Sequence, residues 1–240
     1  MTLTDTLKKN VRELPWLGAK AATLSHLTRK FSFPGSRDYW EARYAQGGTS
    51  GHGSEGILAQ FKADVLNSFV QQHGVDSVIE FGCGDGRQLK LAKYPRYLGI
   101  DVSKTCLRQA MALFAGDATK SFLRYNPQHF LDSANFLTAD LTISLDVIYH
   151  LVEDDIYLLH LKHLFTSAHR YVILYTSDDS HRSGASGHTP PHVRHRPVTR
   201  DVAERFPEWR LQQKIQNPYP HTGGSGTNTS FADFYIYEAR

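Results

Sequence analysis

A run of three glycines at alternate positions constrains the fold of this chain more than any other feature. Gly82, Gly84 and Gly86 directly follow the apolar stretch 77–81, and residues 87–93 are compatible with a helix. Glycine is favoured where the backbone adopts dihedral angles that other residues avoid, and where a ligand lies against the bare main chain. Arg87 occupies the position of the third glycine in the dinucleotide-binding pattern G-x-G-x-x-G. The pattern is therefore E-x-G-x-G-x-G, which predicts a strand, a tight loop and a helix.

The segment from Glu80 to the third glycine resembles motif I of the class I S-adenosylmethionine-dependent methyltransferases. In that family the glycine loop lies under the amino acid part of the cofactor, and an acidic residue ending the second strand binds the ribose hydroxyls. Asp101 ends the apolar stretch 97–101 in this chain. An ionised carboxylate only accepts hydrogen bonds, which suits two adjacent hydroxyl donors. The alternative is an ordinary glycine-rich turn beside a solvated aspartate.

The resemblance implies S-adenosyl-L-methionine as the cofactor and assigns a set of residues to its site. Glu80 is expected to position the glycine loop and Asp101 to hold the ribose. The other residues expected around the cofactor at this end of the sheet are Gly82, Cys83, Gly84, Gly86 and Val102.

The composition is that of a globular protein of one domain with additions. The chain has 240 residues, of which 40% are hydrophobic and 21% charged, and no apolar run approaches membrane-spanning length. A net charge of +3 is too small to argue for a nucleic acid partner. Two cysteines form no disulfide framework, and the first residues lack a signal-peptide pattern, so we predict a cytoplasmic protein.

Residues 54–240 resemble the methyltransferase family, and this resemblance implies the fold. It is a Rossmann-like three-layer α/β/α sandwich with a seven-stranded, mostly parallel sheet and an antiparallel terminal strand pair, expected at 208–215 and 230–237. Apolar residues at helical spacing in 57–69 predict a helix before the first strand. Lys62, Asp64 and Asn67 are expected on the solvated side of that helix.

Two segments precede this region. Residues 1–37 form a locally basic extension, either an arm that touches a membrane surface or partner, or a solvated extension that packs on the body. The domain is expected over 38–240 and begins with an aromatic stretch before the glycine-rich stretch 47–54. Many small-molecule methyltransferases carry a similar segment, which implies a lid at 38–54 with Arg43 or Tyr44 near the cofactor carboxylate. The alternative is a packed aromatic cluster with a flexible linker.

The ends of the third and fourth strands supply the remaining candidates. In the family, a side chain just after the third strand binds the adenine: Asn126 if the strand is 120–125, or Asp140 if it is 135–139. Residues 140–151 resemble the fourth strand and its loop, which face the transferred methyl group. Asp146 and His150 are therefore candidate catalytic residues, since histidine titrates near neutral pH and a nucleophile is more reactive once it loses its proton. Asp146 is also placed beside the cofactor. The alternative for His150 is that it only orients the loop.

The stretch 178–197 is polar and is expected to select the substrate. Its cationic side chains suggest a substrate with a phosphate or carboxylate, and the alternative is a surface loop. No thiolate lies nearby, so a zinc site is not predicted. The predicted reaction is O-methylation of a hydroxylated small molecule such as a sugar or glycoconjugate precursor. The alternatives are N- or S-methylation and a non-catalytic module that binds S-adenosylmethionine. The histidines and arginines of the stretch 178–197, which are expected to contact the substrate, are His181, Arg182, His188, His192, Arg194, His195 and Arg196.

Overall fold

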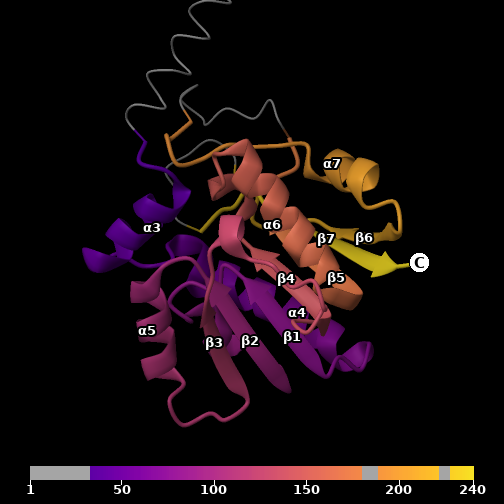
Figure 1. Ribbon diagram of the computed structural model, residues 1–240, viewed down its shortest axis with the longest axis horizontal. Helices are drawn as coiled ribbons and strands as arrows, with labels where there is room; N and C mark the ends of the chain where they lie inside the picture. Colours follow the sequence, from indigo (N-terminus) through magenta and orange to yellow (C-terminus); the bar gives the residue numbers. More distant parts are fainter. Residues whose placement is uncertain (1–32, 180–188, 222–227) are drawn as a thin grey trace, which may run out of the picture. The chain divides into compact units, whose positions relative to one another are not determined.

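The computed structural model describes residues 33–179, 189–221 and 228–240 (Figure 1). The chain divides into two compact units, Met1–Pro34 and Gly35–Arg240. All the helices and strands discussed below belong to the second unit. The predicted basic extension falls largely on residues 1–32, outside the described residues. Among the described helices, none combines the length and the apolar character needed to cross a membrane.

Seven strands form one sheet, as predicted, and their order is β3-β2-β1-β4-β5-β7-β6. Neighbouring strands from β3 to β5 run parallel, and β7 is antiparallel to both β5 and β6. The strand order reverses between β1 and β4, and the crevice above the carboxyl ends at such a point is where open α/β sheets bind ligands. The strands are β1 Ser77–Phe81, β2 Arg96–Asp101, β3 Lys120–Arg124, β4 Ala139–Leu145, β5 Ala168–Thr176, β6 Trp209–Ile215 and β7 Asp233–Ala239.

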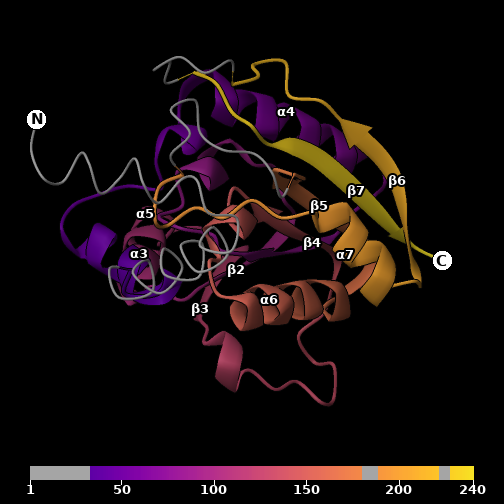
Figure 2. The same cartoon turned by 90° about the horizontal axis from the view of Figure 1, so that it is seen from above.

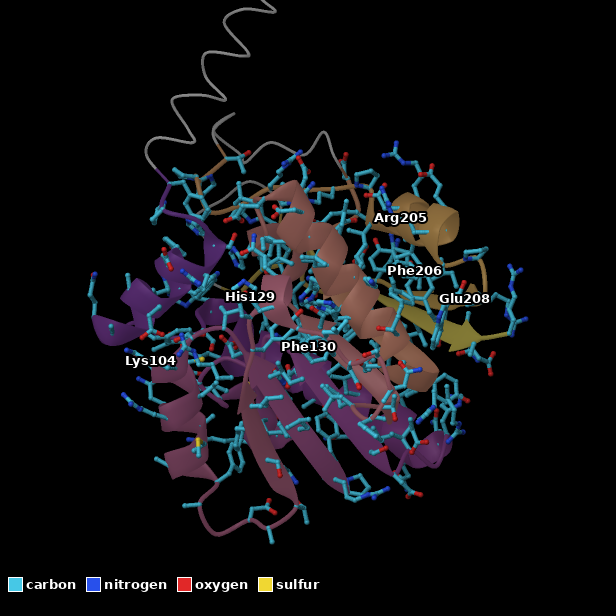
Figure 3. All side chains as sticks on the ribbon, viewed as in Figure 1. Lys104, His129, Phe130, Arg205, Phe206 and Glu208 are labelled. Atoms are coloured by element: carbon cyan, nitrogen blue, oxygen red, sulfur yellow. The ribbon has the colours of Figure 1, made fainter. Side chains whose placement is uncertain are left out.

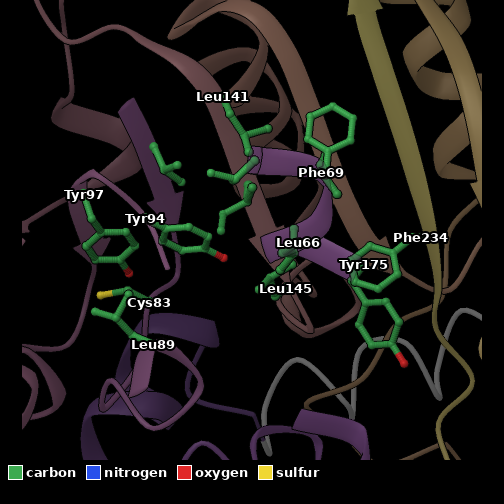
Figure 4. Close-up of a cluster of buried hydrophobic side chains, with 14 of the residues drawn as sticks. Leu66, Phe69, Cys83, Leu89, Tyr94, Tyr97, Leu141, Leu145, Tyr175 and Phe234 are labelled. Carbon is green, nitrogen blue, oxygen red and sulfur yellow. The ribbon is translucent and has the colours of Figure 1, made fainter. Parts of the chain in front are cut away.

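Helices cover both faces of the sheet and complete the three layers (Figure 2). Helices α4 (Gly56–Gln72) and α5 (Lys104–Leu113) pack on one face, and α6 (Asp154–Thr166) and α7 (Val198–Arg205) on the other. Successive strand residues point to opposite faces, so Ile173 joins the cluster under α4, whereas Val172 and Leu174 join the cluster under α6. Figure 4 shows part of the first cluster. Both faces are therefore buried, which explains the apolar character of the central strands.

The helix predicted after the glycine loop is wrong. Residues 87–93 contain only a 3-10 turn, Gln88–Leu91, before the chain enters β2. Pro95 disfavours helical angles in the residue before it, and little chain remains before β2 begins at Arg96. Asn67 of α4 bonds this segment instead, donating to the carbonyl of Leu91 (2.9 Å) and accepting from the amide of Lys93 (2.8 Å).

The connection from β3 to β4 is anchored under α6. It begins with the 3-10 turn Pro127–His129, and Figure 3 labels His129 and the next residue, Phe130. The ring centroid of Phe130 is 4.8 Å from that of His163 on α6. The hydroxyl of Tyr125, directly after β3, is also hydrogen-bonded to His163. These contacts fix the end of β3, where a candidate adenine-binding residue follows.

Candidate functional site

The glycine loop has the backbone geometry that its sequence predicts. Gly82, Gly84 and Gly86 have φ angles of 89°, 57° and 79°, which favour glycine. A Cβ on Gly82 would lie 2.4 Å from a methyl carbon of Val147, and one on Gly84 would lie 2.4 Å from the hydroxyl oxygen of Ser50. The loop therefore presents bare main chain because no side chain fits at these two positions.

Asp101 ends β2 beside this loop and has the geometry of a hydroxyl acceptor. One carboxylate oxygen accepts from the amide of Gly84 (3.0 Å) and the other from the amide of Ser103 (2.9 Å). Burial raises the pKa of the Asp101 carboxyl, and these amide donors oppose the rise. Each carboxylate oxygen can accept a second hydrogen bond, so the pair fits two adjacent ribose hydroxyls. The residues present at this end of the sheet thus fit the implied cofactor.

Glu80 and Cys83 support the loop from inside the fold. The hydroxyl of Tyr97 donates to Glu80 at 2.6 Å, which ties β1 to β2. Burial raises the pKa of Glu80 to about 7, although the Tyr97 hydroxyl and the charge of Lys62 lower it. The side chain of Cys83 is buried against Gly99, where an added Cβ would lie 2.9 Å from the sulfur. Cys83 is therefore placed to offer a ligand its backbone rather than its thiol.

The predicted lid segment lies directly on the glycine loop. It consists of α3 (Ser36–Ala45) and a connection that ends in the 3-10 turn His52–Ser54. The hydroxyls of Tyr44 and Ser50 are 3.0 Å apart, and the amide and hydroxyl of Ser50 donate to Asp85 at 3.2 and 2.9 Å. Tyr44 is buried above Gly84, where its hydroxyl would lie 3.0 Å from an added Cβ. Tyr44 therefore lies beside the glycine loop, and its expected place near the cofactor carboxylate stays a prediction.

Helix α3 is anchored on both sides of this loop. Towards β2, Glu41 accepts from the hydroxyl of Ser103 (2.7 Å), two residues after Asp101. Towards β4, the hydroxyl of Ser36 donates to the carbonyl of His150 (2.7 Å), and the amide of Ser36 donates to Glu153 (2.8 Å). The helix thus spans the carboxyl ends of the strands that carry the predicted site residues.

Asp146 follows β4 in a left-handed conformation, with φ at 60°, and is held by two donors. The ammonium of Lys62 lies 2.5 Å from one carboxylate oxygen, and the hydroxyl of Tyr149 donates to the other at 2.8 Å. Lys62 is only 1% exposed, so the expectation of a solvated lysine is wrong. A buried charge requires a partner of opposite sign, and Asp146 supplies it. Asp146 is therefore a fixed anion at the candidate acceptor side.

His150 lies among aromatic rings near this anion. Its ring centroid is 4.9 Å from that of Trp40 on α3 and 4.5 Å from that of Tyr149. Nδ1 is 3.0 Å from the carbonyl oxygen of His192, so Nδ1 carries the proton and Nε2 the lone pair. Burial lowers the pKa of His150 to about 4, which keeps the imidazole neutral at pH 7. In that state Nε2 can accept a proton.

The described arginines of the stretch 178–197 bind the protein itself. Arg194 and Arg196 both pair with Asp154, at 3.0 and 2.5 Å, and Arg196 also donates to the carbonyl of Leu151 (3.1 Å). These two cations therefore share one carboxylate of the protein itself, and their expected attraction for an anionic substrate stays a prediction. Residues 180–188 of the stretch lie outside the described residues. Within the described ranges, no three histidine, cysteine, aspartate or glutamate residues are grouped to hold a metal ion.

No protein-family model and no curated protein sequence matches this chain. Solved structures do match it. The N-methyltransferase NodS from Bradyrhizobium japonicum WM9, in complex with S-adenosyl-L-homocysteine, has a TM-score of 0.64 at 14% identity, over 85% of this chain and 98% of its own. This is the class I methyltransferase fold.

Two further solved structures with this fold also match the chain. The methyltransferase domain of a bacterial CtHen1 matches with a TM-score of 0.57 at 16% identity, over 74% of this chain and 96% of its own. Magnesium protoporphyrin IX methyltransferase ChlM from Synechocystis PCC 6803, with bound S-adenosyl-L-homocysteine, matches with a TM-score of 0.56 at 16% identity, over 75% and 83%. The fold is therefore shared by enzymes whose names indicate different acceptors.

In this methyltransferase fold, the end of the third strand separates the two adenine candidates. The strand is β3, so Asn126 follows it, and its side-chain oxygen accepts from the amide of Gln128 at 3.2 Å. Asp140 lies within β4, and its carboxylate accepts from the amide of Asp76 (2.9 Å) just before β1 begins. The alternative that places Asp140 beside the adenine is therefore wrong. Val102 lies half-buried directly after Asp101.

Two residues important to the site of this methyltransferase fold were missed in the sequence. Lys62 shares the spacing of the buried residues Leu58 and Leu66 on α4, which was a usable signal. Asp85 lies in the glycine loop itself and accepts a hydrogen bond from Ser50 of the covering segment. No local pattern indicates that second pairing, because its partners are 35 residues apart.

Proposed function

We propose that this chain is a cytoplasmic S-adenosylmethionine-dependent methyltransferase that O-methylates a hydroxylated small molecule, such as a sugar or glycoconjugate precursor, rather than a nucleic acid. One observation carries the proposal: the amide of Gly84, in a loop that excludes side chains, donates to Asp101 at the end of β2. This arrangement lies beside the reversal of strand order, where open α/β sheets bind ligands. ChlM and NodS were both solved with S-adenosyl-L-homocysteine on the same fold.

Each part of the cofactor would meet a different part of the carboxyl edge. Asp101 would accept from the ribose hydroxyls, and the amides of the glycine loop would lie along the amino acid part. Asn126 would approach the adenine from the end of β3. Tyr44 and Ser50 would cover the loop, and ordering such a segment over a ligand excludes water from the reacting groups.

The bound cofactor would supply a methyl group to an acceptor oxygen and would keep the electron pair of the carbon–sulfur bond that breaks. The hydroxyl proton must leave, and Nε2 of His150 is the candidate to receive it. The fixed charge of Asp146 raises the proton affinity of His150, so it would stabilise the imidazolium.

Isothermal titration calorimetry with S-adenosylmethionine and S-adenosyl-L-homocysteine tests the proposal. We expect micromolar binding by the wild type and at least a ~100-fold loss for Asp101→Ala, because two ribose hydroxyls lose a charged acceptor. Asp64→Asn is the matched control, since Asp64 is an exposed aspartate on α4. A well-folded wild type that binds neither compound would contradict the proposal.

An amine acceptor is the second candidate, since the similar NodS structure is named as an N-methyltransferase. Incubation with methyl-labelled cofactor and an extract, followed by identification of the labelled atom in the product, distinguishes oxygen from nitrogen. Cofactor binding without transfer to any acceptor would favour a non-catalytic binding module.

A further inference from the structure

A polar pocket lies at the carboxyl edge on the far side of Asp146 from the glycine loop. Its volume is about 340 Å³, and it forms where β5 and β6 end and β7 begins. This volume falls in the range of small-molecule sites. The neighbouring backbone is tied together there, because Pro220 and Ser230 form a bridge and Asn217 donates to their segment at 3.1 and 3.0 Å. The described walls of the pocket are therefore held in place.

The lining is acidic, and two of its carboxylates are held by contacts within the protein. It contains three aspartates and one lysine, namely Asp178, Asp179, Asp233 and Lys214. Asp178 accepts from the amide of Thr199 at 2.9 Å, and Asp233 pairs with Lys214 at 3.0 Å. Carboxylates only accept hydrogen bonds, so the pocket suits a ligand with many donors and disfavours an anion.

One buried hydroxyl lies behind the lining of this pocket, next to Ser230, and makes no hydrogen bond of normal geometry with the described residues. Tyr175, near the end of β5, is 1% exposed, and Figure 4 shows its hydroxyl directed away from the other labelled side chains. The pocket residues Ser230 and Asp233 lie close enough to influence its pKa, and so does Asp146. A buried hydroxyl is normally hydrogen-bonded, so an unpartnered one next to the pocket residue Ser230 points to a ligand.

The pocket adjoins the candidate acceptor side of the methyltransferase site. Phe231 lines the pocket, and its ring centroid is 4.7 Å from that of Tyr149. The hydroxyl of Tyr149 donates to Asp146, and the ring of Tyr175 lies 5.4 Å from the ammonium of Lys62. Two side chains thus separate the pocket from the fixed Asp146–Lys62 pair.

We propose that this pocket binds the methyl acceptor, and that the acceptor is a sugar without phosphate or carboxylate. The inference rests on the proposed function and assigns its substrate a place and a charge. Sugar hydroxyls are donors that carboxylates accept well, and the aromatic face of Phe231 offers an apolar surface for a sugar ring. The hydroxyl of Tyr175 would gain its partner from the sugar. An uncharged or amine-bearing sugar fits, whereas a sugar phosphate would meet the carboxylates.

Saturation-transfer difference NMR in the presence of S-adenosyl-L-homocysteine tests this assignment. The probes are methyl hexosides, hexosamines and hexose 6-phosphates, each with the wild type, Tyr175→Phe and Tyr237→Phe. Tyr237 is a matched control because its hydroxyl is also buried without a partner among the described residues, but it belongs to the cluster on the other face. We expect hexosides or hexosamines to bind, with affinity reduced about five- to tenfold in Tyr175→Phe and unchanged in Tyr237→Phe.

Both tyrosine variants should fold as stably as the wild type, because neither loses a hydrogen bond in the free protein. Three results would overturn the assignment: binding of none of the sugars, preference for the phosphates, or equal affinity of Tyr175→Phe and the wild type. Binding of S-adenosyl-L-homocysteine is measured in the same samples. If it fails, the proposed function fails, whereas bound S-adenosyl-L-homocysteine without sugar binding overturns only the assignment of this pocket.

Discussion

The two ends of the carboxyl edge present different parts of the chain to a ligand. Above β1 and β2, the surface is made of backbone amides in a loop where side chains do not fit, and Asp101 is bonded to that loop. Above β5, β6 and β7, the surface is made of side chains whose charges are paired, such as Asp233 with Lys214. A backbone site suits one invariable ligand, because its shape changes little with substitution. A side-chain site can be altered one residue at a time, which suits a variable acceptor.

Asp146 and Lys62 lie between the two ends, and their pair carries the largest expected effect. Lys62→Met leaves a carboxylate in a partly buried position with only Tyr149 as donor, so we expect a loss of about 3 to 5 kcal/mol in the free energy of unfolding. Urea unfolding measures it, with the exposed Lys90→Met as control. Lys62→Met combined with Asp146→Asn should be less destabilised than Lys62→Met alone. Additive losses would contradict the pairing.

At the backbone end of the carboxyl edge, above β1 and β2, one added methyl group should greatly weaken cofactor binding. In Gly84→Ala, φ at 57° disfavours alanine, and the new Cβ would lie 2.4 Å from Ser50 in the covering segment. We expect affinity for S-adenosyl-L-homocysteine to fall about 100-fold, because the loop and its cover must both shift, equivalent to about 2.7 kcal/mol. Gly116→Ala is the matched control, since nothing lies within 4 Å of its added Cβ. Titration calorimetry on both variants decides, and unchanged affinity in Gly84→Ala would show that the loop is not the binding surface.

Much of the backbone end could be predicted from the sequence because its contacts are local. Glu80 to Asp101 includes β1, the loop and β2, so spacing alone places the glycines beside the carboxylate. Pro95 was a usable signal against the helix predicted after the loop, whereas the hydrogen bond from Asn67 of α4 to that segment could not be predicted. Asp85 was likewise missed, since its partner Ser50 belongs to a distant segment.

The acceptor end could be predicted only in outline, because ion pairs decide which charges are available. Arg194 and Arg196 suggested an anionic ligand in the sequence, but both pair with Asp154 from α6. The carboxylates of the pocket come from segments more than 50 residues apart, and only the strand order brings Asp179 near Asp233. A sequence pattern cannot show that Asp179 and Asp233 lie close together.

Stability should also depend on pH beneath the acceptor end. His160 lies under β4 and is hydrogen-bonded to Ser144 at 2.9 Å, and burial lowers its pKa from 6.5 to about 3. The unfolded state therefore binds more protons below pH 6.5, so this contribution to stability is present above that pH and is lost as pH falls towards 3. Between pH 6.5 and 5.0 we expect a loss of about 1.5 kcal/mol from His160 alone.

Urea unfolding across this range checks the pH prediction. His160→Gln should retain a hydrogen-bond partner for Ser144 and show a shallower fall in stability with acid. The exposed His169→Gln should follow the wild type. Burial also lowers the pKa of His163 to about 4, so some acid sensitivity should remain in His160→Gln. An identical pH dependence in His160→Gln and the wild type would contradict a buried neutral His160.

The smallest expected effects come from substitutions that remove one or the other of the two anchors of α3. Glu41→Ala removes the acceptor for Ser103 beside Asp101, and Glu153→Ala removes the acceptor for the amide of Ser36 on the β4 side. Each loses a few partly exposed hydrogen bonds, so we expect changes of only about 1 kcal/mol, or about fivefold in affinity. Because one anchor contacts the end of β2 and the other the segment after β4, Glu41→Ala should raise the Kd of S-adenosyl-L-homocysteine, and Glu153→Ala should mainly raise the KM of the acceptor. Equal changes of both constants in both variants would mean that α3 covers the edge as one rigid unit rather than serving its two ends separately.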